Sequence, residues 1–159
     1  PAIDRLARQG NPQAITFPRS QLKKGSLDFS FSGVKTSLLY TVQAMPEQSR
    51  LAKSADLAAG YQEAIVTILV EKAFAAVQSS GAQALAVVGG VSANSRLRRL
   101  LQQRADSENL RLSLPPLRYC TDNAAMIAAA GRQALHAGIR ASLDLDAQAA
   151  MASPFAQAM

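Results

Sequence analysis

The chain has 159 residues, of which 48% are hydrophobic and 18% charged, enough to bury the core of one domain. Its formal net charge of +6 admits a polyanionic partner such as RNA. No run approaches the roughly 20 uncharged apolar residues of a membrane span, so we expect a soluble protein without a membrane partner.

The single cysteine and the first residue bear on the cellular compartment of the protein and on whether the chain is a fragment. Cys120 is the single cysteine, which excludes an internal disulfide and leaves a cysteine metal cluster without partners. A reducing compartment, the cytoplasm, fits best. The chain begins at Pro1, in the middle of a helical pattern and without an initiator methionine, so we expect a fragment or a processed product.

The periodicity of apolar residues predicts a mixture of helices and short strands. Helical spacing indicates helices over 2–9, 34–46, 54–78, from about 92, and from the Thr121-Asp122-Asn123 triplet to about 136. Alternating or continuous apolar runs indicate strands at 28–31, 84–88 and 110–114. The order of these elements predicts an α/β lobe in which helices cover a mixed sheet.

A pair of glycines, Gly89 and Gly90, directly follows the apolar run 84–88. Without a Cβ they would let a ligand approach the backbone at a helix start, which gives the hypothesis of a nucleotide or phosphate site. Asn94 would add an amide donor and acceptor. The alternative is a tight turn with Ser92 as the helix N-cap. The Gly-Lys-Ser/Thr ending of a Walker loop is absent.

Two polar groups allow a functional and a structural interpretation. In the triplet at 121–123 each residue could cap the following helix, or Asp122 could be held to meet a cation. Arg96, Arg98, Arg99 and Arg104 form a basic cluster, and a solvated helix face is its simplest interpretation.

Three stretches together closely resemble one family: DFSFSGVKTSLL, VVGGVSANSRLRRLL and YCTDNAAMIAAAG, in that order. They are similar to the C-terminal half of the TsaD family, the tRNA adenosine threonylcarbamoyltransferases, formerly labelled O-sialoglycoprotein endopeptidases of the glycoprotease family. Residues 1–4 resemble the end of that family's Gly-Gly-Pro segment. The resemblance spans essentially the whole chain.

The resemblance implies a fold and an activity. The fold would be the second lobe of an actin-like ATPase (ASKHA) type, with residues 1–159 as a single lobe of a two-lobed protein and 1–30 as the remnant joining the missing N-terminal lobe. The activity would be transfer of a threonylcarbamoyl group from threonylcarbamoyl-AMP to the adenosine next to the anticodon. Its partners would be tRNA and accessory proteins of the TsaB and TsaE type.

The resemblance also assigns site residues by position, although no catalytic residue. Asp122 matches a metal-ligand aspartate, Asn94 a substrate-binding asparagine, and Asp4 an acidic position that holds the ribose of the adenylate. Gly89 and Gly90 match the corner beside that nucleotide. The expected metal is iron, with zinc or magnesium as alternatives.

One departure from the family pattern limits what this chain can do alone. Two histidines four residues apart complete the family's metal site, whereas this chain has a single histidine, His136. One carboxylate does not hold a metal, so we expect the isolated chain to bind metal weakly and to be inactive. The motif Ser32-Gly33-Val34-Lys35 also matches the family, without an assigned role.

Two other functions stay open from the sequence. A metallopeptidase, the older family label, would require a His-Glu-x-x-His helix or an equivalent, which the chain lacks. A nucleotide-binding module without chemistry would use the same glycine corner, and only an assay of tRNA modification separates it from the transferase.

Overall fold

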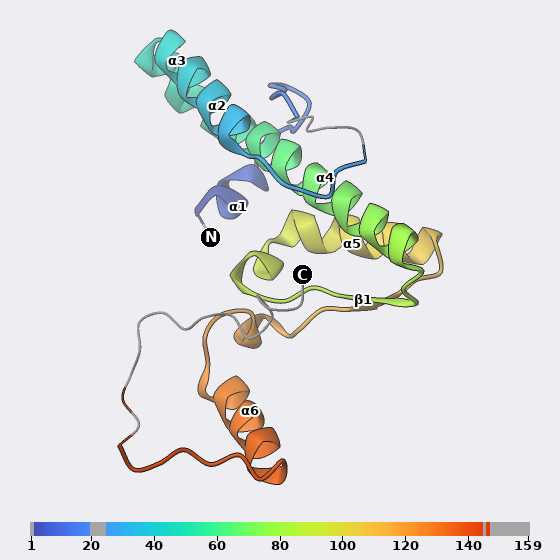
Figure 1. Cartoon of the computed structure of the whole chain (residues 1–159). Coiled ribbons are helices and arrows are strands. Elements are labelled where there is room, and N and C mark those ends of the chain that lie inside the picture. The colour runs from blue at the N-terminus through green and yellow to red at the C-terminus, as the bar shows by residue number, and fades with distance from the viewer. Residues whose placement is uncertain (1, 20–24, 145, 147–159) are drawn as a thin grey trace. The chain divides into compact units, whose positions relative to one another are not determined.

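The computed structural model describes residues 2–19, 25–144 and 146, and these form two compact units, Pro1–Thr121 and Asp122–Met159 (Figure 1). The elements in chain order are α1 (Ala2–Ala7), α2 (Ser32–Ala44), α3 (Glu47–Ala52), α4 (Ser54–Ser80), β1 (Ala84–Ala86), the 3-10 turn η1 (Gly90–Ala93), α5 (Ser95–Ser107), β2 (Arg111–Ser113), the 3-10 turn η2 (Leu117–Tyr119) and α6 (Ala124–His136).

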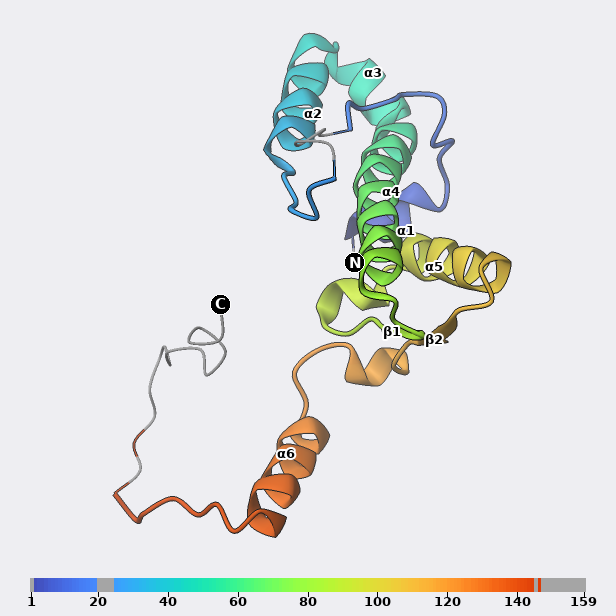
Figure 2. The ribbon, with the colours of Figure 1, turned by 45° about the vertical axis from the view of Figure 1, so that its right-hand side comes forward.

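Helix α4 is the central helix of the first unit and contacts α1, α2, α3 and α5 (Figure 2). Its 27 residues are mostly alanine and aliphatic residues, which favour a long helix with more than one buried face. It ends where Gly81 adopts a left-handed conformation, φ 67°, and the backbone N–H of Gly81 donates to the carbonyl of Val77.

The main core lies between α4, α5 and the two strands. Its buried members are Val66, Val70, Phe74, Leu97, Leu101 and Ala105. The strands β1 and β2 pair in parallel, with Leu85 opposite Leu112, and both leucines pack against this core. Because α5 joins the two parallel strands, β1, α5 and β2 form a crossover unit.

The sheet differs from the predicted mixed sheet. Among the described residues it has two strands, both parallel, and Ala84 and Ala86 are exposed rather than covered on both faces. The expected strand at 28–31 is an irregular segment. Phe29 and Phe31 do lie on the same side, with their rings stacked at 6.0 Å. The alternating pattern thus agrees with the directions of these two side chains, but no described strand pairs with this segment.

A second cluster fixes the N-terminal loop and α2 onto α4. Phe17, Val34, Leu57 and Ala64 are its buried members, and the Phe17 ring meets Tyr61 edge-on at 6.1 Å. The loop approaches so closely that a Cβ at Gly60 of α4 would collide with the Ile15 carbonyl. Three alanines of α1 and α4, Ala7, Ala58 and Ala59, form a third buried cluster.

The second unit contains α6, which has no buried residue. Asn123 caps it, and the exposed apolar residues include Met126, Ile127 and Leu135. Within the part of the chain that the structure describes, no helix combines the length and the apolar character needed to cross a bilayer.

Candidate functional site

The glycine corner leads into α5 through one 3-10 turn. Gly89 has φ 86°, a left-handed conformation that favours glycine. The helix begins at Ser95, later than predicted, and its N-cap is Asn94, whose Oδ1 accepts from the Leu97 backbone N–H at 2.9 Å. The alternative that Ser92 caps the helix is wrong, since the buried Ser92 Oγ donates to the Gly89 carbonyl at 2.7 Å.

The amide of Asn94 is fixed at both ends. Its Nδ2 donates to Oε1 of Gln62 on α4 at 2.7 Å, and the Leu97 contact identifies its oxygen, because a backbone N–H can only donate. One N–H and one oxygen lone pair are used in these two bonds. The amide therefore keeps one donor and one acceptor position for a ligand.

Asp4 of α1 is bound to the same helix start. Its Oδ1 accepts from the Ser95 backbone N–H at 3.1 Å and from Ser95 Oγ at 2.7 Å, across 91 residues of sequence. Its Oδ2 accepts from Arg8 Nη2 at 2.8 Å. Burial raises the pKa of the Asp4 carboxyl, but the hydrogen bonds from Ser95 and Arg8, with the Arg8 charge, outweigh burial and hold that pKa below its usual range.

A pocket of about 700 Å³ opens beside this helix start, within the first unit. It is lined by Asp4, Arg5, Arg8, Gly90, Val91, Ala93, Asn94, Leu117 and Thr121. Three of the residues that the resemblance matches to a nucleotide site, Asp4, Gly90 and Asn94, thus line one pocket. Gly89 precedes Gly90 without lining it. Two guanidinium groups and one carboxylate make the charged lining positive overall.

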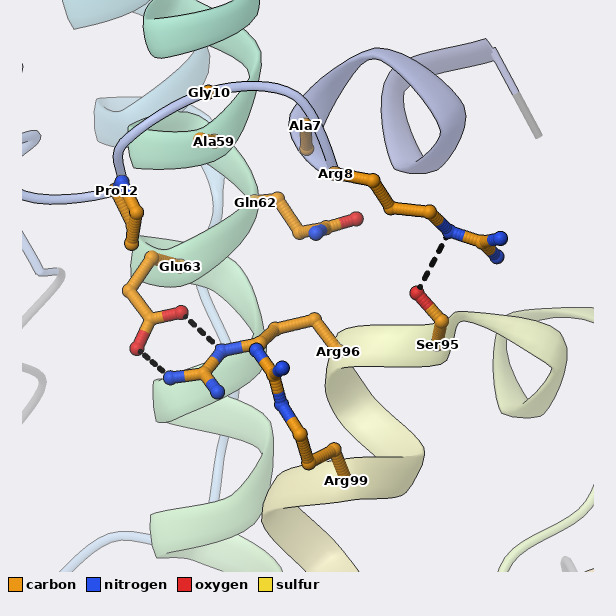
Figure 3. A pocket seen from close by; sticks show the side chains of 10 residues that line it. All are labelled: Ala7, Arg8, Gly10, Pro12, Ala59, Gln62, Glu63, Ser95, Arg96 and Arg99. Atoms are coloured by element: carbon orange, nitrogen blue, oxygen red, sulfur yellow. Dashed lines mark hydrogen bonds and ion pairs between the residues drawn. The ribbon is translucent and has the colours of Figure 1, made fainter.

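A smaller pocket of about 440 Å³ lies between the end of α1, α4 and α5 (Figure 3). Glu63 of α4 and Arg96 of α5 meet there in a bidentate ion pair, at 2.6 and 2.7 Å. The hydrogen bond from Arg96 lowers the pKa of Glu63, only partly opposed by burial, and the same bond raises the pKa of Arg96. Arg8 lines both pockets and its Nε donates to Ser95 Oγ at 3.2 Å.

The basic cluster of α5 is therefore not a uniformly solvated face. Arg96 is paired with Glu63, and Arg98 donates to two backbone carbonyls. Arg104 pairs with Glu108 and lies over the Phe74 ring, 5.2 Å from its centroid. Only Arg99 matches the expectation of an exposed side chain without a hydrogen bond or ion pair among the described residues.

Asp122 does not cap α6. Asn123 does, through an Oδ1 that accepts from the Met126 backbone N–H at 3.1 Å. Across residues 2–19, 25–144 and 146, no group of three or more histidine, cysteine, aspartate or glutamate side chains could hold a metal ion. These residues alone do not fit a metal centre, so no chemical step is assigned to one.

Several residues of the site were missed in the sequence. Gln62 had a local signal in the sequence, since it is a polar residue four positions after Ala58, in the apolar stripe of the helical pattern. The structure leaves it 8% exposed. The roles of Arg8, Ser95 and Arg98 depend on tertiary contacts that no local pattern marks. Of the family-matching motif 32–35, Val34 is fully buried and packs in the second cluster, which gives that motif a structural role.

Comparison with known proteins supports the resemblance. The family model TsaD, described as tRNA N6-adenosine threonylcarbamoyltransferase, matches residues 1–129. Relatives of that name include proteins of Anaeromyxobacter dehalogenans, 53% identical over 152 residues, and of Thermosipho africanus, 41% identical over 147 residues. These matches cover 94% and 92% of this chain but 45% and 44% of the relatives, so the chain spans less than half their length. This chain belongs to the TsaD family.

Proposed function

We propose that this chain supplies the adenylate-binding part of a tRNA N6-adenosine threonylcarbamoyltransferase that works in the cytoplasm. The reaction moves the threonylcarbamoyl group of threonylcarbamoyl-AMP to the exocyclic nitrogen of the adenosine next to the anticodon. The observation that carries this proposal is the pocket in which Asp4 and two arginines near it lie together with Gly90 and Asn94, which are distant from them in sequence.

The chemistry of the lining suits an adenylate. Arg5 and Arg8 offer positive charge to a phosphate group. Asp4 uses three of its roughly four lone-pair positions within the protein, which leaves one for a ribose hydroxyl. A Cβ added to Gly90 would meet nothing within 4 Å, so this backbone lies open to the pocket. The pocket volume falls in the range typical of small-molecule sites, about 300 to 1,000 Å³.

In the proposed reaction this chain binds and orients the donor. The amine of adenosine attacks the carbamoyl carbon, and the bond from that carbon to the phosphate oxygen breaks. AMP leaves with the electron pair of that bond, and the proton of the amine passes to water. Negative charge grows on the departing phosphate. Arg5 and Arg8 would stabilise that charge, an effect that is strongest for donors fixed in advance, as Arg8 is by Asp4 and Ser95.

The proposal includes a metal ion to which this chain would contribute a single ligand. Asp122 would provide one ligand, for iron or alternatively zinc or magnesium, while the remaining ligands would come from protein outside this chain. A metal of this kind would supply Lewis acidity toward the acyl donor.

Partners and fold type are likewise proposed. The net charge of +6 supports a tRNA partner, and accessory proteins of the TsaB and TsaE type would complete the transfer complex. The parallel unit β1–α5–β2, covered by α4, is compatible with a lobe of an actin-like ATPase fold.

A chimera tests the function directly. This chain would replace the matching segment of the Anaeromyxobacter dehalogenans relative, and transfer from threonylcarbamoyl-AMP to tRNA would be measured with the accessory proteins present. We expect transfer, and a loss of at least about tenfold in kcat/KM for Asn94→Ala, whose amide the pocket would lose. A chimera that binds AMP without transferring the group would favour the non-catalytic module. Peptide cleavage without transfer would favour the peptidase.

A further inference from the structure

Two backbone segments that line the proposed adenylate pocket are joined by one side chain that lies outside it. We propose that Arg98 of α5 is a positioning residue, which fixes the segment Gly90–Asn94 relative to the segment 115–121 and so sets the affinity for the adenylate. This inference rests on the proposed function of the pocket. Arg98 is not among the residues that line it.

The contacts of Arg98 reach both segments at once. Its Nη1 donates to the Ser92 carbonyl at 2.9 Å, and its Nη2 donates to the Pro115 carbonyl at 2.9 Å. Ser92 lies in η1, between the lining residues Val91 and Ala93, and Pro115 begins the loop that carries η2. One planar group therefore connects carbonyls 23 residues apart in sequence.

In each of the two segments, a buried residue in contact with Arg98 makes a further hydrogen bond to a residue close to it in sequence. Ser92 is 1% exposed and its Oγ donates to the Gly89 carbonyl, so this one buried residue connects the Arg98 contact to the exposed glycine corner. On the other side the Cys120 thiol is 2% exposed and lies 3.8 Å from Arg98 Nη1. The same thiol donates to the Pro116 carbonyl, with 3.7 Å between Sγ and O. Arg98 thus contacts both segments close to the residues that line the pocket.

The geometry requires a guanidinium rather than any cation. A guanidinium presents several N–H groups in a rigid fork, so it can satisfy two carbonyls that face different nitrogens. A lysine ammonium is a single point charge on a flexible stem and would hold one carbonyl well at a time. The proposal therefore predicts that charge alone does not replace Arg98.

The expected kinetic effect follows from where Arg98 acts. A change in pocket shape weakens adenylate binding equally in the ground state and the transition state, which raises KM and leaves kcat nearly unchanged. In the chimera described above, we expect Arg98→Met to raise the KM for threonylcarbamoyl-AMP and the Kd for AMP by about tenfold. The substitution removes two hydrogen bonds from a charged group, and part of that loss falls on folding rather than on binding. Arg98→Lys should fall between Arg98→Met and the wild type.

Arg99 provides the matched control, since it is the next residue of the same helix and does not line this pocket. Arg99→Met should stay within about twofold of the wild type in both constants, as for a surface change away from such contacts. Circular dichroism and thermal melting would verify the fold of each variant. If Arg98→Met does not fold, Arg98→Lys decides: an AMP Kd equal to that of the wild type would overturn the proposal.

The outcomes separate this proposal from the proposed function. Arg98→Met matching Arg99→Met in Kd and KM would overturn the role of Arg98 and leave the transferase intact. A chimera that binds AMP but transfers nothing, with a weaker AMP Kd in Arg98→Met, would support Arg98 and refute the transferase. A fall in kcat alone, with both binding constants unchanged, would also refute the positioning role.

Discussion

Removal of the Asp4 carboxylate tests whether α1 is anchored to the start of α5. Asp4→Ala deletes three hydrogen bonds, two from Ser95 and one from Arg8. A hydrogen bond to a charged group contributes about 1.5–3 kcal/mol. The two Ser95 bonds share one oxygen, and the Arg8 side chain is 62% exposed, so its pair adds at most about 1 kcal/mol. We expect the free energy of unfolding to fall by about 3 kcal/mol, which corresponds to about 10 °C in Tm.

The matched control is Asp56→Ala. The Asp56 carboxylate accepts a single bond, from the Asn11 backbone N–H at 2.7 Å, and lies in the first turn of α4. A cap-like contact of this kind contributes about 1 kcal/mol. Chemical denaturation followed by circular dichroism gives both values. A loss in Asp4→Ala within about 0.5 kcal/mol of the loss in Asp56→Ala would refute the anchoring role.

Acid should remove the same stabilisation. The pKa of Asp4 is lower in the folded chain than in the unfolded chain, so its contribution is complete above the unfolded pKa, about 4, and is lost as the pH falls through the folded pKa. The difference in unfolding free energy between the wild type and Asp4→Asn should therefore be constant near neutral pH and shrink below about pH 4. A difference that does not change with acidification would contradict the lowered pKa.

Two further variants test the packing around α4. Glu63→Gln breaks the bidentate pair with Arg96, whose side chains are 26% and 21% exposed, and should cost about 1 kcal/mol in urea unfolding at pH 7 and less at pH 3. Gly60→Ala should cost several kcal/mol in the same assay, because its methyl group would collide with the Ile15 carbonyl, whereas Gly33→Ala, with open space around it, should stabilise α2 by about 0.5–1 kcal/mol. Equal effects of the two alanines would contradict the close approach of the loop to α4.

Most helices were predictable because their signals are local, although the short helix α3, Glu47–Ala52, was not expected. Apolar spacing placed α4 and α6 to within a few residues at most of their ends, and the run 84–88 contained β1. The errors at the helix starts have one physical cause. Several polar residues precede each of α5 and α6, and only backbone geometry decides which side chain meets the third N–H. In both cases an asparagine does, at Asn94 and Asn123.

The contacts that build the site could not be predicted from local sequence patterns, because they join residues far apart in the chain. Asp4 and Ser95 lie 91 residues apart, and nothing in either neighbourhood specifies the other. The resemblance to the family marked Asp4 and Asn94, since it compares whole motifs rather than periodicities. It did not mark Gln62 or Arg98, because the work of these residues is to hold neighbours in place.

The structure also changes how a loss of activity at these positions should be interpreted. Asn94 caps α5 while it faces the pocket, and Asp4 anchors α1 while it faces the same pocket. Substituting either residue therefore lowers stability and removes a ligand contact together. An adenylate bound to both would, by the same linkage, raise the Tm of the wild type with increasing concentration, and this rise should be smaller in Asn94→Ala. The ratio of these shifts, rather than activity alone, separates the binding role of each residue from its role in folding.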